Sequence, residues 1–318
     1  MKALILAGGF AKRLWPLTLD KAKPLLPVAG KPVISHIVDK IPSDVSIIVS
    51  TNAAFADDFH EWRDVHANRD ITIFVEPAQS EGTKKGALAA VALAIRELGI
   101  DEDLLLIGGD NFFTFPVTDF LNKVSTQPAI VAHDIGDREE AKKYGVVIAD
   151  GHRIQGFQEK PTQPLSTLVG ACFYFFPHAH LPAVLETADD MPDRLGGIFE
   201  RFLERGVEAH VFSFPGYWND IGSFGAYLDA HVQSGADLDI PSALLNDALG
   251  NTFEGVNHID PTAKIIGSRI CDSIVLPGAV IENCTVESCI VDRDTEIMDE
   301  ERVNEIIRAG VDDAGRPS

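Results

Sequence analysis

The chain has 318 residues, 45% of them hydrophobic, which is enough for one large core and a smaller one. Its 48 acidic residues outnumber its 27 basic ones, and the formal net charge of −21 argues against nucleic acid or an anionic membrane surface as a partner. No apolar run reaches the length of a membrane span, and the N-terminus lacks a signal-peptide pattern. The four cysteines form no CxxC pair. We therefore expect a cytoplasmic protein.

Apolar runs alternate with amphipathic segments over about the first 230 residues. This alternation predicts an α/β fold with a Rossmann-like, mostly parallel mixed sheet flanked by helices. Strands are expected at 3–7, 45–50, 71–75, 104–108, 129–132, 146–149, 171–176 and 209–214. Helices are expected at 33–40, 53–68, 82–98, 116–123, 181–188, 198–205 and 223–234.

After Asp237 the pattern changes. Branched aliphatic residues recur every five or six positions from Ile259 to Ile297, which is typical of a parallel β-helix. About two coils fit, and residues 300–309 are predicted to form a short amphipathic helix after them. Cys284 and Cys289 fall within the coils, where we expect small buried apolar side chains. The pattern divides the chain into a domain of residues 1–236 and an extension of residues 237–318.

The beginning of the chain combines a glycine turn with positive charge. The apolar run Lys2 to Ala7 ends in Gly8 and Gly9. Glycines after a strand let backbone N–H groups approach an anion closely, because no Cβ holds it away. Four cations follow within a short stretch: Arg13, Lys21, Lys23 and Lys31. In so acidic a chain, this concentration of positive charge indicates a polyphosphate ligand. The segment matches neither the dinucleotide fingerprint nor the phosphate loop.

A series of motifs resembles the signature of the sugar-1-phosphate nucleotidyltransferases. In chain order they are LILAGGFAKRLWPLT, KAKPLLPVAGKP, EPAQSEGTKKGAL, LLLIGGDN, YGVV, FQEKP, GACFYFF and YWNDIG. The resemblance covers roughly residues 1–230 and is closest to the glucose-1-phosphate thymidylyl- and uridylyltransferase-like members. The tail is similar to the C-terminal extension of many members, which implies a short left-handed β-helix.

On the nucleotide side, the resemblance implies that Ala7, Gly8 and Gly9 line the pocket with backbone groups. Arg13 and Lys23 would hold the triphosphate and neutralise the departing pyrophosphate, as an arginine fork and a lysine point charge suit. Gln79 would hydrogen-bond the base, with Gly82 and Thr83 closing around it.

On the sugar side, the resemblance implies that Gly145 and Gly170 lie against the hexose. Glu159 would accept hydrogen bonds from its hydroxyls, and Lys160 would bind its 1-phosphate.

Asp110 and Asp220 would hold Mg²⁺. Asp110 ends an apolar strand and Asp220 lies in an aromatic loop, and Mg²⁺ often binds one or two carboxylates together with substrate phosphates. A helix N-cap and a turn are the structural alternatives for the two aspartates. The ten histidines show no metal-site spacing, so His152 and His210 are expected to be ordinary surface or core residues.

The chain also departs from the family pattern. Ala11–Lys12 stand where many members have Gly-Thr, Lys84–Lys85–Gly86 replace the usual small residues, and Leu168–Val169 occupy the place of an asparagine. The departure at Leu168–Val169 bears on which sugar is bound and not on the type of reaction.

The implied reaction joins an NTP, with dTTP or UTP favoured, to a hexose 1-phosphate, with glucose 1-phosphate favoured. It gives an NDP-sugar and pyrophosphate. A mannose-1-phosphate guanylyltransferase-like enzyme and a catalytically inactive regulatory relative are alternatives. An acyltransferase built on the β-helix is disfavoured because the repeat contains no histidine suited to catalysis. Stacked coils leave an end or face to cover, so we expect a homo-oligomer.

Overall fold

The computed structural model describes residues 1–77, 86–124, 126–234, 240–245 and 247–311. These residues divide into two compact units. Unit 1 consists of Met1–Gly9 and Ile34–Asp220, and unit 2 of Phe10–Val33 and Ile221–Ser318. Among the described helices, none is long and apolar enough to cross a bilayer.

Unit 1 is built on a nine-stranded sheet with the order β5-β4-β1-β6-β11-β8-β12-β10-β9. Strands β5, β4, β1 and β6 are parallel to one another, as are β8 and β12. Continuous burial of Leu104–Gly108 shows that the centre of the sheet is covered on both faces. The strands are Lys2–Leu6 (β1), Ser46–Asn52 (β4), Ile71–Glu76 (β5), Leu104–Gly108 (β6), Ala129–Asp134 (β8), Gly145–Asp150 (β9), Arg153–Glu159 (β10), Leu168–Phe176 (β11) and His210–Ser213 (β12).

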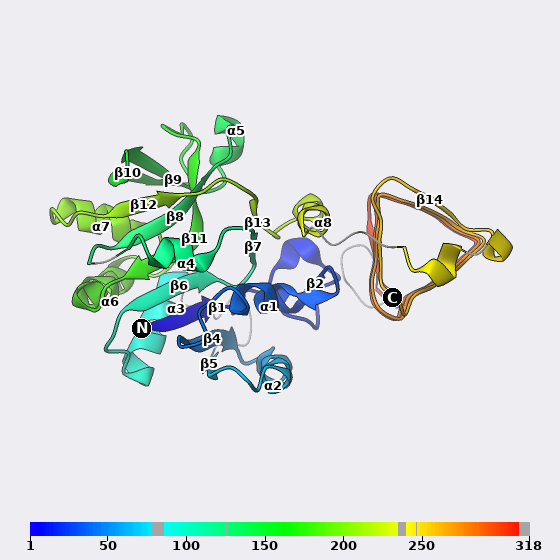
Figure 1. Cartoon of the computed structure of the whole chain (residues 1–318), viewed down its shortest axis with the longest axis horizontal. Helices are drawn as coiled ribbons and strands as arrows, with labels where there is room; N and C mark the ends of the chain where they lie inside the picture. Colours follow the sequence, from blue (N-terminus) through cyan, green and yellow to red (C-terminus); the bar gives the residue numbers. More distant parts are fainter. Residues whose placement is uncertain (78–85, 125, 235–239, 246, 312–318) are drawn as a thin grey trace. The chain divides into compact units, whose positions relative to one another are not determined.

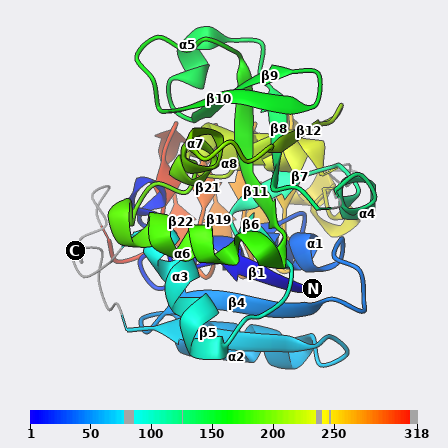
Figure 2. The same cartoon turned by 90° about the vertical axis from the view of Figure 1, so that its left-hand side faces the viewer.

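Helices pack on both faces of this sheet because its strands alternate their side chains. On β11, Tyr174 packs against Phe199 of α7, whereas the neighbouring Phe173 packs against Phe120 of α4. Helix α6 contacts both α3 and α7, and these helices lie in front of the strands in Figure 2. The helices of unit 1 are Val33–Val38 (α1), Ala56–Val65 (α2), Ala87–Leu98 (α3), Val117–Leu121 (α4), Arg138–Ala141 (α5), Leu181–Asp190 (α6) and Gly197–Glu204 (α7), with a 3-10 turn at His178–His180 (η4).

The eight expected strands and seven expected helices are all present, with shifted ends; residues 82–85 of the third helix lie outside the described residues. The sheet is less parallel than predicted, because β11 runs antiparallel to β6 and β8, and β10 antiparallel to β9 and β12. Strand β10 escaped prediction because polar residues and Gly156, at a register shift, interrupt its apolar alternation.

The C-terminal part of unit 2 is a stack of three-sided coils, seen end-on as a triangle in Figure 1. Paired residues lie sixteen positions apart, as in the series Arg269, Thr285 and Glu301. Left-handed backbone at Asn283 and Asp299, and at Ser288 and Asn304, turns successive corners. The three sides are formed by β14-β17-β20-β23, β15-β18-β21-β24 and β16-β19-β22.

These strands are Thr252–Glu254 (β14), His258–Ile259 (β15), Lys264–Ile266 (β16), Arg269–Cys271 (β17), Ile274–Val275 (β18), Val280–Glu282 (β19), Thr285–Glu287 (β20), Ile290–Val291 (β21), Glu296–Met298 (β22), Glu301–Val303 (β23) and Ile306–Ile307 (β24). Two 3-10 turns precede them, Ser242–Leu245 (η5) and Asp247–Leu249 (η6).

Two predictions for this region were wrong. The coils number more than two, since two of the sides contain four strands each. The expected helix at 300–309 is instead β23 and β24, because Ile306 continues the ladder of Ile290 and the Asn304 N–H donates to the Glu287 carbonyl. Cys284 and Cys289 are buried as predicted.

Unit 2 also contains the loop of residues 10–33, named the signature loop below. It comprises two 3-10 turns, Lys12–Leu14 (η1) and Lys23–Leu25 (η2), and the short hairpin Pro27–Val28 (β2) and Lys31–Pro32 (β3). Helix Phe224–Gln233 (α8) holds the hairpin. The Tyr227 hydroxyl donates to the Pro27 carbonyl, and the Ala29 N–H donates to His231 Nδ1 at 3.3 Å.

Candidate active site

The glycine turn lies at the carboxyl end of β1, beside the ends of β4 and β6. The Gly109 N–H donates to the Leu6 carbonyl, and the Ala7 N–H to the Ser50 carbonyl. A Cβ added at Gly8 would come within 3.0 Å of Glu76 Oε1, whereas one at Gly9 would meet nothing within 4 Å. The turn is therefore packed on one side and open on the other, at the edge where α/β sheets bind ligands.

The two candidate metal-binding carboxylates belong to one small ribbon. Asn111–Phe113 (β7) pairs antiparallel with Trp218–Asp220 (β13), and Asp220 lies opposite Asn111. Asp110 immediately precedes this pair, at the end of β6. Residues that are far apart in the sequence are thus brought together by backbone pairing.

The side chain of Asn111 fixes this ribbon to the main sheet. Its amide Nδ2 donates to the Gly108 carbonyl at 2.9 Å, and its Oδ1 accepts from the Trp218 indole at 2.8 Å. Both Asn111 and Trp218 are buried. Trp218 therefore braces the strand that carries Asp220.

Cys172 lies beside both carboxylates and was not identified as a site residue from the sequence. It has a φ of 49°, where the pairing of β11 with β8 shifts register. Burial raises the pKa of its thiol to about 12, with further contributions from the charges of Asp110 and Asp220. A thiol held neutral in this way fills space beside the carboxylates and does not act as a nucleophile.

The four residues expected on the sugar side gather where β9, β10 and β11 meet. Gly145 pairs with Glu159 across β9 and β10, and its carbonyl oxygen lies 3.8 Å from a Cβ placed on Gly170. The backbone N–H of Lys160 donates to the Tyr144 carbonyl at 3.1 Å.

Gly145 has no room for a side chain, because a Cβ there would meet Phe157 Cζ at 2.4 Å. Burial raises the pKa of Glu159, an effect that the positive charges of Lys160 and Arg194 oppose.

A cavity of about 450 Å³ opens at the carboxyl ends of the strands, within the usual size range of small-molecule sites. It includes Gly8, Gly9 and Asp110 from the predicted set. Its other lining residues were assigned no role from the sequence. They come from strand ends, the start of α3 and the 193–195 segment: Leu6, Glu76, Gly86, Ala87, Ala90, Gly108, Cys172, Asp193 and Leu195.

The remaining predicted residues are not among the described residues of unit 1. Gln79, Gly82 and Thr83 lie outside the described residues. Arg13 and Lys23 belong to the signature loop of unit 2, where Arg13 is exposed in η1 and Lys23 is 7% exposed at the start of η2. The Nζ of Lys12 lies 5.9 Å from the centre of the Trp15 ring, which gives this residue a neighbour within the loop.

Comparison with known proteins identifies the family of the chain. The family model described as "Nucleotidyl transferase" matches residues 2–236. The chain belongs to this family. A mannose-1-phosphate guanyltransferase beta-B of Xenopus laevis is 32% identical over 276 residues, which are 83% of this chain and 73% of that protein.

A "bifunctional protein GlmU" of Methanocaldococcus jannaschii is 27% identical over 241 residues, 73% of this chain but only 53% of the relative. A putative mannose-1-phosphate guanyltransferase of Sulfolobus acidocaldarius is 28% identical, over 73% of this chain and 63% of that protein. The chain thus matches about half to two thirds of the length of these two relatives.

Among solved structures, a putative glucose-1-phosphate thymidylyltransferase of Bacillus anthracis, crystallised with a sucrose, has the same fold. Its TM-score is 0.65 at 24% identity, over 76% of this chain and 97% of that one.

Replacing Asn111 by leucine should destabilise the protein. The substitution conserves approximate volume but leaves the Trp218 N–H and the Gly108 carbonyl without their partner, at about 1–3 kcal/mol for each buried group. We expect the free energy of unfolding, measured with denaturant, to fall by about 2–4 kcal/mol. The exposed Asn68→Leu is the matched control, and equal stability of the two variants would contradict the bracing role.

Proposed function

We propose that the chain transfers a nucleoside monophosphate from an NTP to a hexose 1-phosphate, forming an NDP-sugar and pyrophosphate. The observation that carries this proposal is the cavity at the strand ends, lined by the glycine turn and by Asp110, in a chain of the nucleotidyl transferase family. The nucleotide would enter this cavity, and the sugar phosphate would approach Gly145, Glu159, Lys160 and Gly170.

In this reaction a phosphate oxygen of the sugar phosphate attacks the α-phosphorus of the NTP, and pyrophosphate leaves. The nucleophile is already an anion at neutral pH, so no protein base is required. The Lys160 ammonium would hold the sugar phosphate in line, while Arg13 and Lys23 would neutralise the leaving pyrophosphate. Catalysis would come from positioning and from fixed positive charge, as in other phosphoryl transfers.

Asp110 and Asp220 are suited to hold Mg²⁺. Both offer hard carboxylate oxygens, and the pairing of β7 with β13 keeps the segments that bear them side by side. The ion would supply charge stabilisation to the phosphate oxygens during transfer. The protein's own part is to keep the two carboxylates aligned, through Asn111 and Trp218.

Two combinations of nucleotide and sugar phosphate are candidate substrates. The family resemblance favours dTTP or UTP with glucose 1-phosphate, and Gln79 would then read the base. The cavity favours GTP in one respect, because its wall includes the Glu76 carboxylate, which accepts a hydrogen bond from the Ser50 hydroxyl at 2.8 Å. A carboxylate suits the N–H donors of guanine, and two of the relatives are named as mannose-1-phosphate guanyltransferases.

A matrix of nucleotides against sugar phosphates tests the proposal directly. We expect pyrophosphate release with one of dTTP, UTP and GTP when it is combined with glucose 1-phosphate or mannose 1-phosphate in the presence of MgCl₂. A preference for GTP with mannose 1-phosphate would select the second set. Absence of release from every pair would overturn the proposal in favour of a regulatory, inactive relative.

Asp110→Asn should abolish most of the activity without unfolding the protein. The amide keeps the shape but loses the negative charge, so pyrophosphate release should fall by about 10²-fold or more. Thermal unfolding of the variant should match that of the wild type. Asp119→Asn, on the first turn of α4, is the matched control and should retain turnover. Near-normal turnover of the Asp110 variant would exclude it from metal binding.

A further inference from the structure

Asp20 attaches the signature loop to the coils of unit 2. Asp20 accepts from Arg293 Nη2 at 2.6 Å and from Arg308 Nη1 at 2.9 Å, and Arg308 Nη2 also donates to it. Arg308 Nη1 makes a further hydrogen bond, at 2.9 Å, to the Pro16 carbonyl. Residues from opposite ends of the chain thus hold one segment of the loop.

This attachment differs from an ordinary surface ion pair. Arg308 contacts Asp20 with both terminal nitrogens, and its side chain is only 19% exposed. The same guanidinium lies 3.5 Å from Asp292, which is fully buried. The hydrogen bonds from Arg308 and Arg293 lower the pKa of Asp20 to about 2, so the carboxylate is charged at any physiological pH. Bidentate geometry and a network of charges are the conditions under which such pairs contribute most.

The loop is also held at a second point. Helix α8 binds the hairpin β2–β3, through Tyr227 to Pro27 and His231 to Ala29. His231 in turn packs on His258 of the first coil, with ring centres 4.4 Å apart. Lys23 lies between the two points of attachment, and Arg13 lies just before the first.

We propose that Arg308 and Arg293 are positioning residues for nucleotide transfer, because they fix the loop that carries Arg13 and Lys23. This inference rests on the proposed function of Arg13 and Lys23. A flexible loop would have to be ordered each time a triphosphate bound, whereas a loop fixed beforehand presents its cations at no such cost. The residues act through Asp20 and the Pro16 carbonyl and do not touch the substrate themselves.

The test replaces Arg308 by methionine, which keeps the aliphatic stem but removes the donors. The matched control is Arg302→Met, because Arg302 belongs to the same coil and pairs with Glu300 and Glu305 there. We expect kcat/KM for the NTP to fall roughly tenfold or more in the Arg308 variant, with KM for the sugar phosphate unchanged and with both variants fully folded at the assay temperature. Equal kinetics in the two variants would overturn the proposal.

Two further measurements separate this inference from the proposed function. Hydrogen exchange of residues 16–20 reports loop order without any activity, and it should be faster in Arg308→Met than in Arg302→Met. Asp20→Asn should produce the same change, and combining it with Arg308→Met should add little, because both remove one interaction. Faster exchange in a protein with no transferase activity would refute the proposed function alone; unchanged exchange would refute the positioning role.

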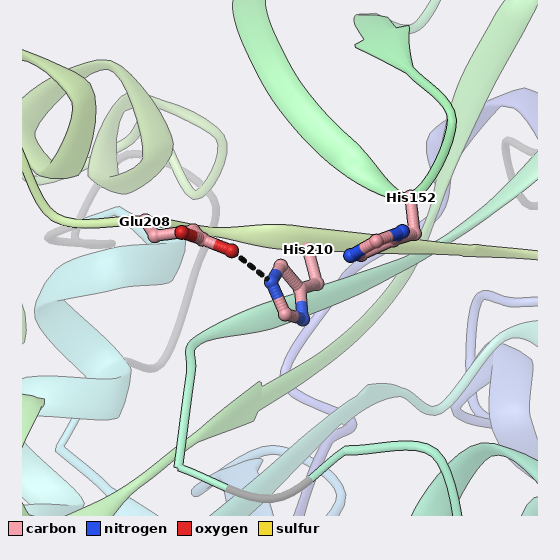
Figure 3. Close-up of side chains that lie close together, drawn as sticks. All are labelled: His152, Glu208 and His210. Atoms are coloured by element: carbon pink, nitrogen blue, oxygen red, sulfur yellow. Dashed lines mark hydrogen bonds and ion pairs between the residues drawn. The ribbon is translucent and has the colours of Figure 1, made fainter.

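A second inference concerns three side chains of unit 1 that lie close together and belong to none of the family motifs. The ligand atoms of His152, Glu208 and His210 lie within 4.8 Å of one another, the one such group among the residues that the structure describes. Figure 3 shows the Glu208 carboxylate directed at the His210 ring, with His152 beside it. Sequence spacing could not reveal this cluster, because the two histidines lie far apart along the chain.

The backbone fixes the positions of these residues. His152 forms the turn between β9 and β10 and its carbonyl accepts from the Val211 N–H at 2.8 Å; His210 begins β12 and pairs with Arg153. The two imidazole centres are 4.8 Å apart and nearly perpendicular. Arg153 Nε lies 3.1 Å from Glu208 Oε1, so this arginine holds the carboxylate and would have to turn away from a bound cation.

We infer that His152, Glu208 and His210 form a site for Zn²⁺ or a similar transition-metal ion, with water as the remaining ligand. Two imidazoles and one carboxylate are a common donor set for Zn²⁺, whereas Mg²⁺ prefers oxygen ligands and is not expected here. The site is separate from the one proposed for Mg²⁺ at Asp110 and Asp220.

Calorimetric titration of the full chain with ZnCl₂ tests this site. We expect one ion per chain, with affinity reduced at least about tenfold in His152→Ala and in His210→Ala. His178→Ala is the control. His178 is also exposed and lies 2.6 Å from a carboxylate oxygen of Asp101, but this pair contains one imidazole where the proposed site has two. Loss of binding in the control, equal binding in every variant, or no binding to the wild type would each overturn the assignment.

Discussion

The hydrogen bonds of Asn111 are the interaction on which the rest of the candidate site depends. One amide side chain joins the end of β6, through the Gly108 carbonyl, to the Trp218 indole of β13. Because the strand that carries Trp218 also carries Asp220, this side chain sets where the second carboxylate lies relative to Asp110. The close approach leaves no room for a side chain at position 108, where a Cβ would meet the Asn111 amide at 2.4 Å and the Cys172 sulfur at 3.0 Å. The side chains of Asn111 and Cys172 can therefore occupy these positions only because residue 108 is a glycine.

Elements buried on both faces could be predicted from the sequence, because a short continuous apolar run such as Leu104–Gly108 is typical of a strand at the centre of a covered sheet. The short ribbon of β7 and β13 could not, since strands of three residues have no recognisable period. The error at residues 300–309 has a similar cause. The spacing of Val303, Ile306 and Ile307 fits the apolar face of a helix and also the sides of a coil. The strand conformation is selected by the preceding coil, whose strands β20 and β21 pair with β23 and β24.

The candidate site was predictable to the extent that its residues belong to motifs. The glycine turn and Asp110 line one cavity, and Gly145 and Glu159 pair across neighbouring strands. Glu76 and Cys172 also lie in the quoted motifs, but neither they nor Asp193 could be assigned a role from the sequence, because their contribution depends on which strand ends and loops meet. The same holds for His152 and His210, which the sequence presents as unrelated surface residues and β-strand pairing brings together.

The distribution of charge shows what the proposed chemistry would require of the signature loop. The cavity in unit 1 is lined by the carboxylates of Glu76, Asp110 and Asp193, in a chain whose formal net charge is −21. Such a surface repels a triphosphate unless positive charge is supplied at a fixed place. The cations suited to that purpose, Arg13 and Lys23, are in the signature loop, and the loop is held by Asp20 to two arginines of the coils. Under the proposed function, the packing of the signature loop on the coils would therefore hold Arg13 and Lys23 in a fixed arrangement before the phosphates bind, so that no binding free energy is spent on ordering the loop.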